Sequence, residues 1–252
     1  LDANRIRPEY VAAKDLTSND MVVFPIPNQV TDVPSLSTDD LRMIGIMIGD
    51  GHVSQTTMDQ YVALNATNKQ NVADFVMSYL DSKLVKCGIH DVGRNTIRYT
   101  WRAGNGFAIT RAMIYSQSND KQVHPSLLNL PVEKSLALVR GILETDGCIR
   151  GKETSEVTLE MASQNVIRSV RHLLLRCGIL TSGYTRNRVG EEHTTKYGDT
   201  IRTTKQTWVL RIPRHPMLCG VLNVQPGKFS KVFQYKDMLF SRINTIEHCQ
   251  VK

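Results

Sequence analysis

Hydrophobic positions recur with a helical period in some stretches of the chain and alternate with polar positions in others. Residues 72–85 place apolar side chains every three to four positions, which predicts an amphipathic helix. Thr96–Arg102 alternates apolar and polar residues, which predicts a strand with one buried face. Glu156–Met161 alternates in the same way, and residues 164–176 return to the helical period. The pattern therefore predicts a protein of mixed helices and strands.

Two apolar helical stretches end in the same dipeptide. Met43–Gly51 reads MIGIMIGDG and Val139–Gly147 reads VRGILETDG, so that Asp50 and Asp146 lie 96 positions apart in a chain of 252 residues. An Asp-Gly after a helix is also an ordinary helix end followed by a turn. Two copies at this spacing instead indicate an internal duplication.

A second repeat supports the duplication. Gln70-Asn-Val and Gln164-Asn-Val each open a helix that closes in Cys-Gly-Ile. We therefore predict the order αββαββα twice. Three helices are expected at 72–85, 106–115 and 164–176, and three more begin at Ser37, at Pro131 and near His215. In the first half the expected strands are 52–57, 60–66, one shortly before residue 96, and 96–102. In the second half they are 147–151, 156–161, 181–189 and 203–212, with a polar connection at 190–199 between the last two.

Small residues form a ridge on each repeated helix. They lie four positions apart and so share one helix face; they are Gly45 and Gly49 in the first copy, and Gly141 and Thr145 in the second. Two such helices can pack side by side, which would bring Asp50 and Asp146 together at their C-terminal ends. Two adjacent carboxylates repel unless a proton or a divalent cation lies between them, so a shared metal site is expected.

The composition of the chain indicates what kind of molecule it binds and where in the cell it acts. The formal net charge is +7 and the isoelectric point is near 9.2, which favours a polyanion such as nucleic acid but also fits a merely soluble basic protein. The five cysteines are scattered without a CxxC pair, which favours reduced thiols over a structural zinc. Because there is no long apolar run and no signal peptide, we expect an intracellular protein, in the cytoplasm or with the nucleoid or nucleus, with no membrane association and no secretion.

At this point the sequence resembles the LAGLIDADG homing endonucleases of the monomeric, two-motif type. Ile48 replaces the first acidic letter of the first motif and Arg140 replaces a small letter of the second, but the acidic residue that the family uses for metal is kept in both. The resemblance implies an α+β fold, in which a duplicated αββαββα unit with pseudo-two-fold symmetry forms a saddle from two antiparallel sheets.

The resemblance also implies an activity. The expected protein is a site-specific, double-strand DNA homing endonuclease that hydrolyses phosphodiester bonds in a long, nearly asymmetric target with Mg²⁺, or with Mn²⁺ as a substitute, and leaves short 3′ overhangs. The implied metal ligands are Asp50 and Asp146 with the neighbouring carbonyls of Gly49 and Thr145, and the implied catalytic lysines are Lys121 and Lys228, with Lys231 as the competing choice in the second half. Each of these lysines could also be a solvated loop residue.

The exposed face of each sheet is expected to contact DNA, because Arg, Asn, Gln and Lys suit base edges and phosphates. For any one residue, a solvated sheet face is an equally good interpretation. The candidate residues are His52, Ser54, Tyr61, Asn65, Arg94, Arg98, Thr100 and Arg102 in the first half, and Arg150, Lys152, Thr158, Tyr184, Arg186, Arg188, Lys205 and Arg211 in the second.

The flanks suggest an origin. Residues 1–37 and 239–252 resemble strand regions of the intein splicing module that often carries this endonuclease, so the expected divisions are 1–37, a first half at 38–130, a second half at 131–238, and 239–252. Leu1 and the terminal Val251-Lys252 lack the residues that splicing needs, so we expect no splicing from this chain. An RNA maturase and a catalytically inactive DNA-binding protein of the same fold are the alternative functions.

Overall fold

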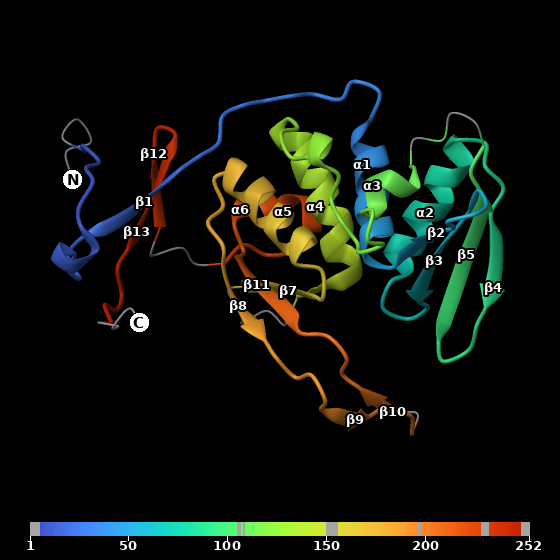
Figure 1. The fold of residues 1–252 in the computed structure, drawn as a ribbon. Helices are drawn as coiled ribbons and strands as arrows, with labels where there is room; N and C mark the ends of the chain where they lie inside the picture. Colours follow the sequence, from blue (N-terminus) through green and yellow to red (C-terminus); the bar gives the residue numbers. More distant parts are fainter. Residues whose placement is uncertain are drawn as a thin grey trace.

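The two repeated helices lie against each other at the centre of the molecule (Figure 1). In the computed structural model, which describes residues 6–104, 107, 109–149, 156–195, 198–227 and 232–247, they are α1 (Thr38–Gly49) and α4 (Val132–Asp146). The start of α1 follows from its sequence: the Ser37 hydroxyl accepts a hydrogen bond from the Asp40 N–H, and the Asp40 carboxylate accepts one from the Ser37 N–H. This capping box satisfies backbone donors that the first turn leaves unpaired.

Glycine allows the two helix backbones to touch. A Cβ added to Gly45 would lie 2.3 Å from the Leu138 carbonyl oxygen, and one added to Gly141 would lie 2.1 Å from the Arg42 carbonyl oxygen. Neither position has room for any side chain. The predicted packing of the two small-residue ridges is therefore confirmed.

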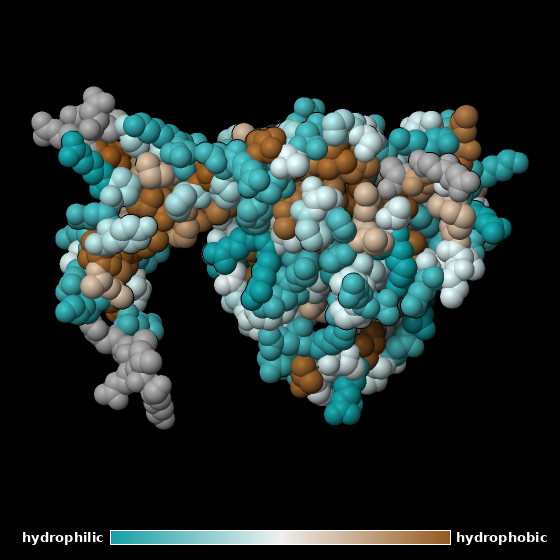
Figure 2. Space-filling view, turned by 45° about the horizontal axis from the view of Figure 1, so that its top comes forward, coloured by the Kyte–Doolittle hydropathy of each residue, from teal (hydrophilic) through white to brown (hydrophobic). Residues whose placement is uncertain are grey.

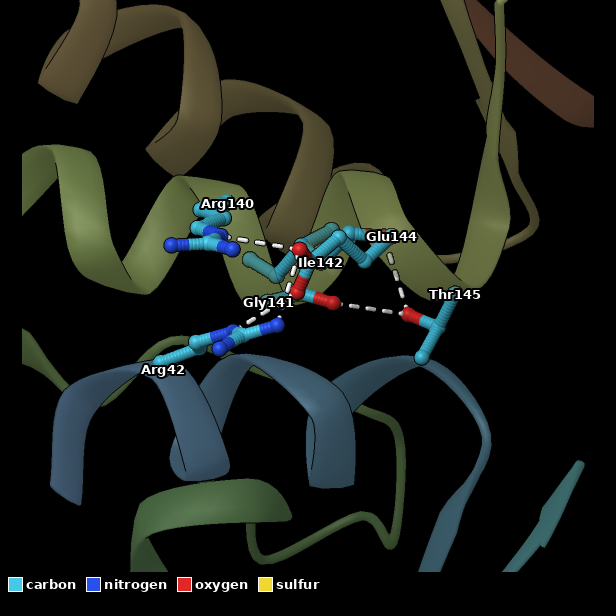
Figure 3. Close-up of polar contacts among 6 residues, drawn as sticks. All are labelled: Arg42, Arg140, Gly141, Ile142, Glu144 and Thr145. Atoms are coloured by element: carbon cyan, nitrogen blue, oxygen red, sulfur yellow. Dashed lines mark hydrogen bonds and ion pairs between the residues drawn. The ribbon is translucent and has the colours of Figure 1, made fainter. Parts of the chain in front are cut away.

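A charged cluster lies beside this contact, on one side of it (Figure 3). Arg42 of α1 donates two hydrogen bonds, of 2.8 and 3.0 Å, to the Glu144 carboxylate of α4, and Arg140 donates a third, of 2.8 Å. The side chains of Arg42 and Glu144 are only 12% and 8% exposed. Because the motif repeat aligns Glu144 with Ile48, this cluster breaks the symmetry of the two copies.

Each half of the described chain contributes a four-stranded antiparallel sheet with the same topology. The strand orders are β2-β3-β5-β4 and β6-β7-β11-β8. The first sheet contains β2 (Gly51–Val53), β3 (Asp59–Asn65), β4 (Gly88–Asp91) and β5 (Thr96–Arg102); the second contains β6 (Gly147–Cys148), β7 (Glu156–Met161), β8 (Ser182–Arg186) and β11 (Thr207–Pro213). The matching order in the two halves shows the duplication at the level of topology.

Helices cover the inner face of each sheet and complete the core. Tyr99 and Trp101 of β5 are buried, as the alternation predicts, and so are Val157 and Leu159 of β7. The covering helices are α2 (Gln70–Ser82) and α5 (Gln164–Arg176), and α6 (Pro216–Leu222) packs against α4. No helix in the described part of the chain is both long and apolar enough to cross a membrane.

Three local predictions need correction. The helix expected at 106–115 is only α3 (Arg111–Ile114) in the described residues, and the side-chain amide of Gln60 donates 2.9 Å to the Ile109 carbonyl, which fixes that segment in an irregular conformation. The polar connection at 190–199 contributes a short hairpin of β9 (Glu192–Thr194) and β10 (Thr200–Arg202). Of the strand expected at 147–151, β6 covers Gly147 and Cys148.

A third sheet joins the two ends of the described chain. It has the order β1-β13-β12, from β1 (Met21–Pro25), β13 (Met238–Arg242) and β12 (Val232–Tyr235), and stands apart from the central helices in Figure 1. The sheet borders a groove of about 980 Å³ with an apolar lining, and hydrophobic residues gather on this lobe in Figure 2. Arg176, at the end of α5, donates to the carbonyls of Pro27 and Asn129, so it ties the chain leaving β1 to the second half.

Candidate active site and nucleic-acid interface

Asp50 and Asp146 lie together where α1 and α4 end. Asp50 is the C-cap of α1, with its N–H bonded to the Ile46 carbonyl at 3.0 Å, and Asp146 is the last residue of α4. A Cβ on Gly49 would lie 3.0 Å from Asp146 Oδ2 and 2.0 Å from Thr145 Oγ1. The Asp146 carboxylate therefore sits beside the residue that precedes Asp50.

The surroundings of Asp146 disfavour its charged form. Burial is the larger cause that raises the pKa of Asp146 to about 6, and repulsion from Asp50 adds to it, while Lys69 and Lys121 act in the opposite direction. Both carboxylates also lie at helix C-termini, where the helix dipole disfavours negative charge. The arrangement is typical of a site that binds a positive ion.

Lys69 contacts this site and was not among the predicted residues. Its ammonium lies 2.5 Å from Asp50 Oδ2 and 2.5 Å from the Thr145 carbonyl oxygen. The sequence contained one signal: Lys69 is at the N-cap of α2, where Ser, Thr, Asp or Asn is favoured, and the duplication places Ser163 at the equivalent position.

Lys121, the lysine predicted in the first half, lies close to the two aspartates. Its ammonium donates to the carbonyls of Met47 and Gly51, at 2.5 Å each. Burial lowers the pKa of Lys121 to about 8, although the charges of Asp146 and Asp50 act to raise it. Lys228 and the competing Lys231 lie outside the described residues.

The donors present suit Mg²⁺. No cluster of three or more His, Cys, Asp or Glu that could hold a metal occurs among the described residues, so the site offers two carboxylates and the carbonyls of the last helical turns. Mg²⁺ is usually held by one or two carboxylates, keeps several waters and takes further oxygens from phosphate. Asp50 and Asp146, with the Gly49 and Thr145 carbonyls, therefore fit as its ligands.

The predicted residues of the first sheet share its outer face. His52, Tyr61 and Thr100 are directly opposite one another on β2, β3 and β5. The His52 ring stacks on Tyr61 with centroids 5.0 Å apart, and the Arg98 guanidinium lies 4.7 Å from the Tyr61 ring centroid. Burial, followed by the charges of Arg111 and Lys121, lowers the pKa of His52, which favours the neutral form of its ring.

The remaining first-half candidates differ in whether their side chains already make contacts within the protein. Ser54 and Asn65 accept hydrogen bonds from backbone N–H groups two and three residues later, so both shape turns. Arg102 is exposed at the end of β5. Arg94, in the turn between β4 and β5, forms an ion pair of 2.7 Å with Asp199 of the second half.

The second sheet carries carboxylates that the sequence interpretation overlooked. Thr158, Tyr184, Arg186 and Arg211 line a groove of about 390 Å³ that also contacts Asp146. Glu160 accepts from Arg186, and Glu156 lies 2.6 Å from Arg211. The strand alternation that placed Thr158 on this face places both glutamates there too.

Four second-half candidates lie elsewhere or are not described. Arg188 is 3.8 Å from Glu191 in the exposed segment after β8. Lys205 is 3.6 Å from Asp120 and lines a pocket of about 410 Å³ that also contacts Lys121 and Asp146. Arg150 and Lys152 lie outside the described residues.

Comparison with known proteins gives one family match and one longer relative. Residues 133–211 match the family model of the LAGLIDADG-like domain. The iron-sulfur cluster assembly SufBD family protein ML0593 of Mycobacterium leprae (strain TN) is 25% identical over 202 residues, which are 77% of this chain and 22% of that protein. The chain therefore spans about a fifth of the length of this curated relative.

Solved structures share the fold. A structure from a study of mesophilic variants of the homing endonuclease I-DmoI aligns with a TM-score of 0.50 and 13% identity, over 76% of this chain and 98% of that one. A variant of I-DmoI in complex with its target DNA in the presence of Mg aligns with a TM-score of 0.50 and 12% identity, over 77% and 99%. Full-length DUF199/WhiA aligns over 77% and 58%, at 11% identity and a TM-score of 0.49. The predicted fold, that of the LAGLIDADG homing endonucleases, is confirmed.

Proposed function

We propose that this protein is a site-specific, metal-dependent endonuclease that cuts both strands of a long, nearly asymmetric DNA target and leaves short 3′ overhangs. The observation that carries the proposal is the pair Asp50 and Asp146, held together by the glycine contact of α1 and α4 and flanked by Lys69 and Lys121. The shared fold with I-DmoI, which is solved with its target DNA, supports it.

The two sheets supply a surface of the right chemistry. In each half the outer face carries arginine, hydroxyl and aromatic side chains, and the chain has a net charge of +7. Arginine and amide side chains can contact bases in the major groove, while positive charge attracts phosphates. Since both halves belong to one chain, we propose a monomer that reads two different half-sites.

Mg²⁺, held by Asp50 and Asp146, would activate a water molecule and place positive charge next to the scissile phosphate. Asp146, with a pKa of about 6, is ionised at neutral pH and can take part in that site. Lys121, with a pKa of about 8, is mostly protonated at pH 7, so its ammonium can stabilise negative charge that develops on the phosphate. We propose Lys228 as its counterpart in the second half.

The decisive experiment uses an unbiased substrate. The protein is incubated with a genomic or randomised double-stranded DNA library in Mg²⁺, and newly formed ends are sequenced. We expect recurrent ends within one long shared sequence, with 3′ overhangs, and none with Asp50→Asn, Asp146→Asn or EDTA.

Binding without cleavage would contradict the endonuclease. If DNA is retained on the protein and no ends form, a DNA-binding protein of the same fold becomes the better conclusion, and retention of structured RNA instead would favour a maturase. Unchanged cleavage by Asp50→Asn and Asp146→Asn would show that the metal ligands are wrongly chosen.

We also propose that the chain derives from an intein and acts inside the cell. β1 and β13 pair although more than 200 residues separate them, so both ends of the described chain fold into one sheet that the endonuclease halves interrupt. The alignment with only 22% of a longer relative agrees with an inserted module. The parental reading frame tests this: splicing residues on both sides of the present sequence would support the origin, and an unrelated frame would contradict it.

A further inference from the structure

Lys69 breaks two rules of helix structure. It occupies the N-cap of α2 without a capping hydrogen bond from its side chain, and it places a positive charge at the positive end of the helix dipole. At the equivalent position of α5, Ser163 caps the helix normally and accepts from the Val166 N–H at 3.3 Å. Such local violations are expected where a residue serves a function.

The Lys69 side chain crosses from one half of the protein to the other. It begins in the first half and contacts Asp50 at the end of α1 together with the Thr145 carbonyl at the end of α4, both at 2.5 Å. The side chains of Lys69 and Asp50 are each 23% exposed, so solvent and solutes can reach the contact.

Both oxygens belong to groups that we assign as metal ligands, the Asp50 carboxylate of the first motif and the Thr145 carbonyl of the second. An ammonium at hydrogen-bond distance from both occupies the position that a divalent cation between them would take, and the two positive charges would repel. We propose that Lys69 is a positioning residue: it neutralises Asp50 in the metal-free protein and, when a divalent cation binds, swings out to a phosphate of the bound DNA. This inference rests on the proposed function.

Among the described residues, no lysine pairs with the aspartate of the second motif, Asp146, as Lys69 pairs with Asp50. Ser163 is uncharged, and its hydroxyl donates to the Lys121 carbonyl at 2.6 Å. No ion pair to Asp146 occurs within the described part of the chain. Among the described residues, competition between lysine and metal therefore occurs on the Asp50 side, where it would couple metal binding to the presence of DNA.

Lys69→Met tests the inference because it keeps the length of the side chain and removes its charge. In a calorimetric titration of the DNA-free protein with Mg²⁺ alone, we expect Lys69→Met to bind about tenfold more tightly than the wild type. Lys69→Arg, which keeps the charge, should bind as weakly as the wild type. Lys83→Met is the matched control, since Lys83 lies at the other end of α2 and pairs with Asp40 of α1 at 2.8 Å.

A second readout follows the released side chain. In Mg²⁺ and with a target DNA whose scissile bonds carry a non-hydrolysable linkage, Lys69→Met should weaken DNA binding and reduce the slope of log affinity against log salt by about one. Equal Mg²⁺ affinity for Lys69→Met and the wild type would overturn the inference.

The outcomes separate the inference from the proposed function. If the wild type cuts DNA and Lys69→Met binds Mg²⁺ no more tightly, only the role of Lys69 is wrong. If neither the wild type nor any variant binds Mg²⁺ or cuts DNA, both the proposed function and the role of Lys69 are wrong. Circular dichroism melts of each variant exclude misfolding as the cause.

Discussion

Two aspartates at equivalent positions of a repeat have different environments. Asp50 has the Lys69 ammonium at 2.5 Å, whereas burial and the charge of Asp50 raise the pKa of Asp146 to about 6. The sequence repeat alone would make them equal, so their difference comes from the neighbours that each half supplies. This difference leads to two predictions at the residue scale.

Asp146→Asn should stabilise the metal-free protein at neutral pH. The carboxyl has a pKa of 3.8 when unfolded and about 6 when folded, so the folded state loses stability as pH rises from about 4 to above 6. We expect a gain on the order of 1–3 kcal/mol at pH 7.5 and little at pH 4. Urea unfolding in EDTA at both pH values measures this difference in the free energy of unfolding.

Asp50→Asn is the comparison for this prediction: it relieves the repulsion on Asp146 but also removes the ion pair with Lys69, so its gain should be smaller. An equal gain from Asp146→Asn at both pH values would show that the ionised carboxylate is not the source of the instability.

The rate of DNA cleavage should have a bell-shaped dependence on pH. The rising limb near pH 6 reflects loss of the Asp146 proton, which competes with the metal, and higher Mg²⁺ should move it to lower pH. The falling limb above about pH 8 reflects loss of the Lys121 proton. Single-turnover rates between pH 5 and 9 measure both limbs; a falling limb that Lys121→Arg leaves in place would exclude Lys121 as its origin.

At the scale of the elements, the contact of α1 with α4 determines where the site forms. Gly45 and Gly141 let the backbones touch, and the Arg42–Glu144–Arg140 cluster lies at one side of the contact. A buried ion pair with three hydrogen bonds favours one pairing of the helices over alternatives. The carboxylates meet because this contact fixes both helix ends.

Gly141→Ala should therefore be strongly destabilising. Its Cβ would lie 2.1 Å from the Arg42 carbonyl oxygen, which the helix backbone cannot easily move, and we expect a loss of about 3 kcal/mol or failure to fold. Gly220→Ala is the control: it lies in α6, its Cβ would meet nothing within 4 Å, and alanine favours a helix. Thermal unfolding of both variants measures this, and similar melting temperatures would show that the helices separate easily.

At the scale of the molecule, the two halves meet again far from the central helices. The Arg94–Asp199 pair connects the β4–β5 turn of the first half with the segment leading into β10 of the second. Both residues are well exposed, so the pair adds little stability. It does place a carboxylate beside a candidate DNA contact.

Asp199→Asn should strengthen DNA binding, because it removes a negative charge beside Arg94, a candidate DNA contact. We expect a several-fold gain at low salt and a slope of log affinity against log salt that is steeper by about one. Asp237→Asn, in the turn between β12 and β13, changes the net charge equally on the third sheet and should have little effect. Fluorescence anisotropy at several salt concentrations measures both, and equal changes would indicate a general charge effect.

The sequence by itself determined the elements and the duplication. The helical and alternating periods, the Ser37 cap and the small residues of both ridges fixed the helices, the sheet faces and the pairing of α1 with α4, because these depend on local chemistry and on repeats. The repeats pointed to the two aspartates, and the family resemblance pointed to Lys121.

The tertiary structure alone decided which distant groups meet. Nothing local in the sequence connects Lys69 with Thr145, Glu160 with Arg186, or Arg94 with Asp199, since these contacts depend on how strands and helices from separate segments pack. The same is true of the short α3, where a distant Gln60 side chain bonds to the Ile109 carbonyl. The shift of the Asp146 pKa likewise comes from burial and neighbouring charge, which exist only in the folded chain.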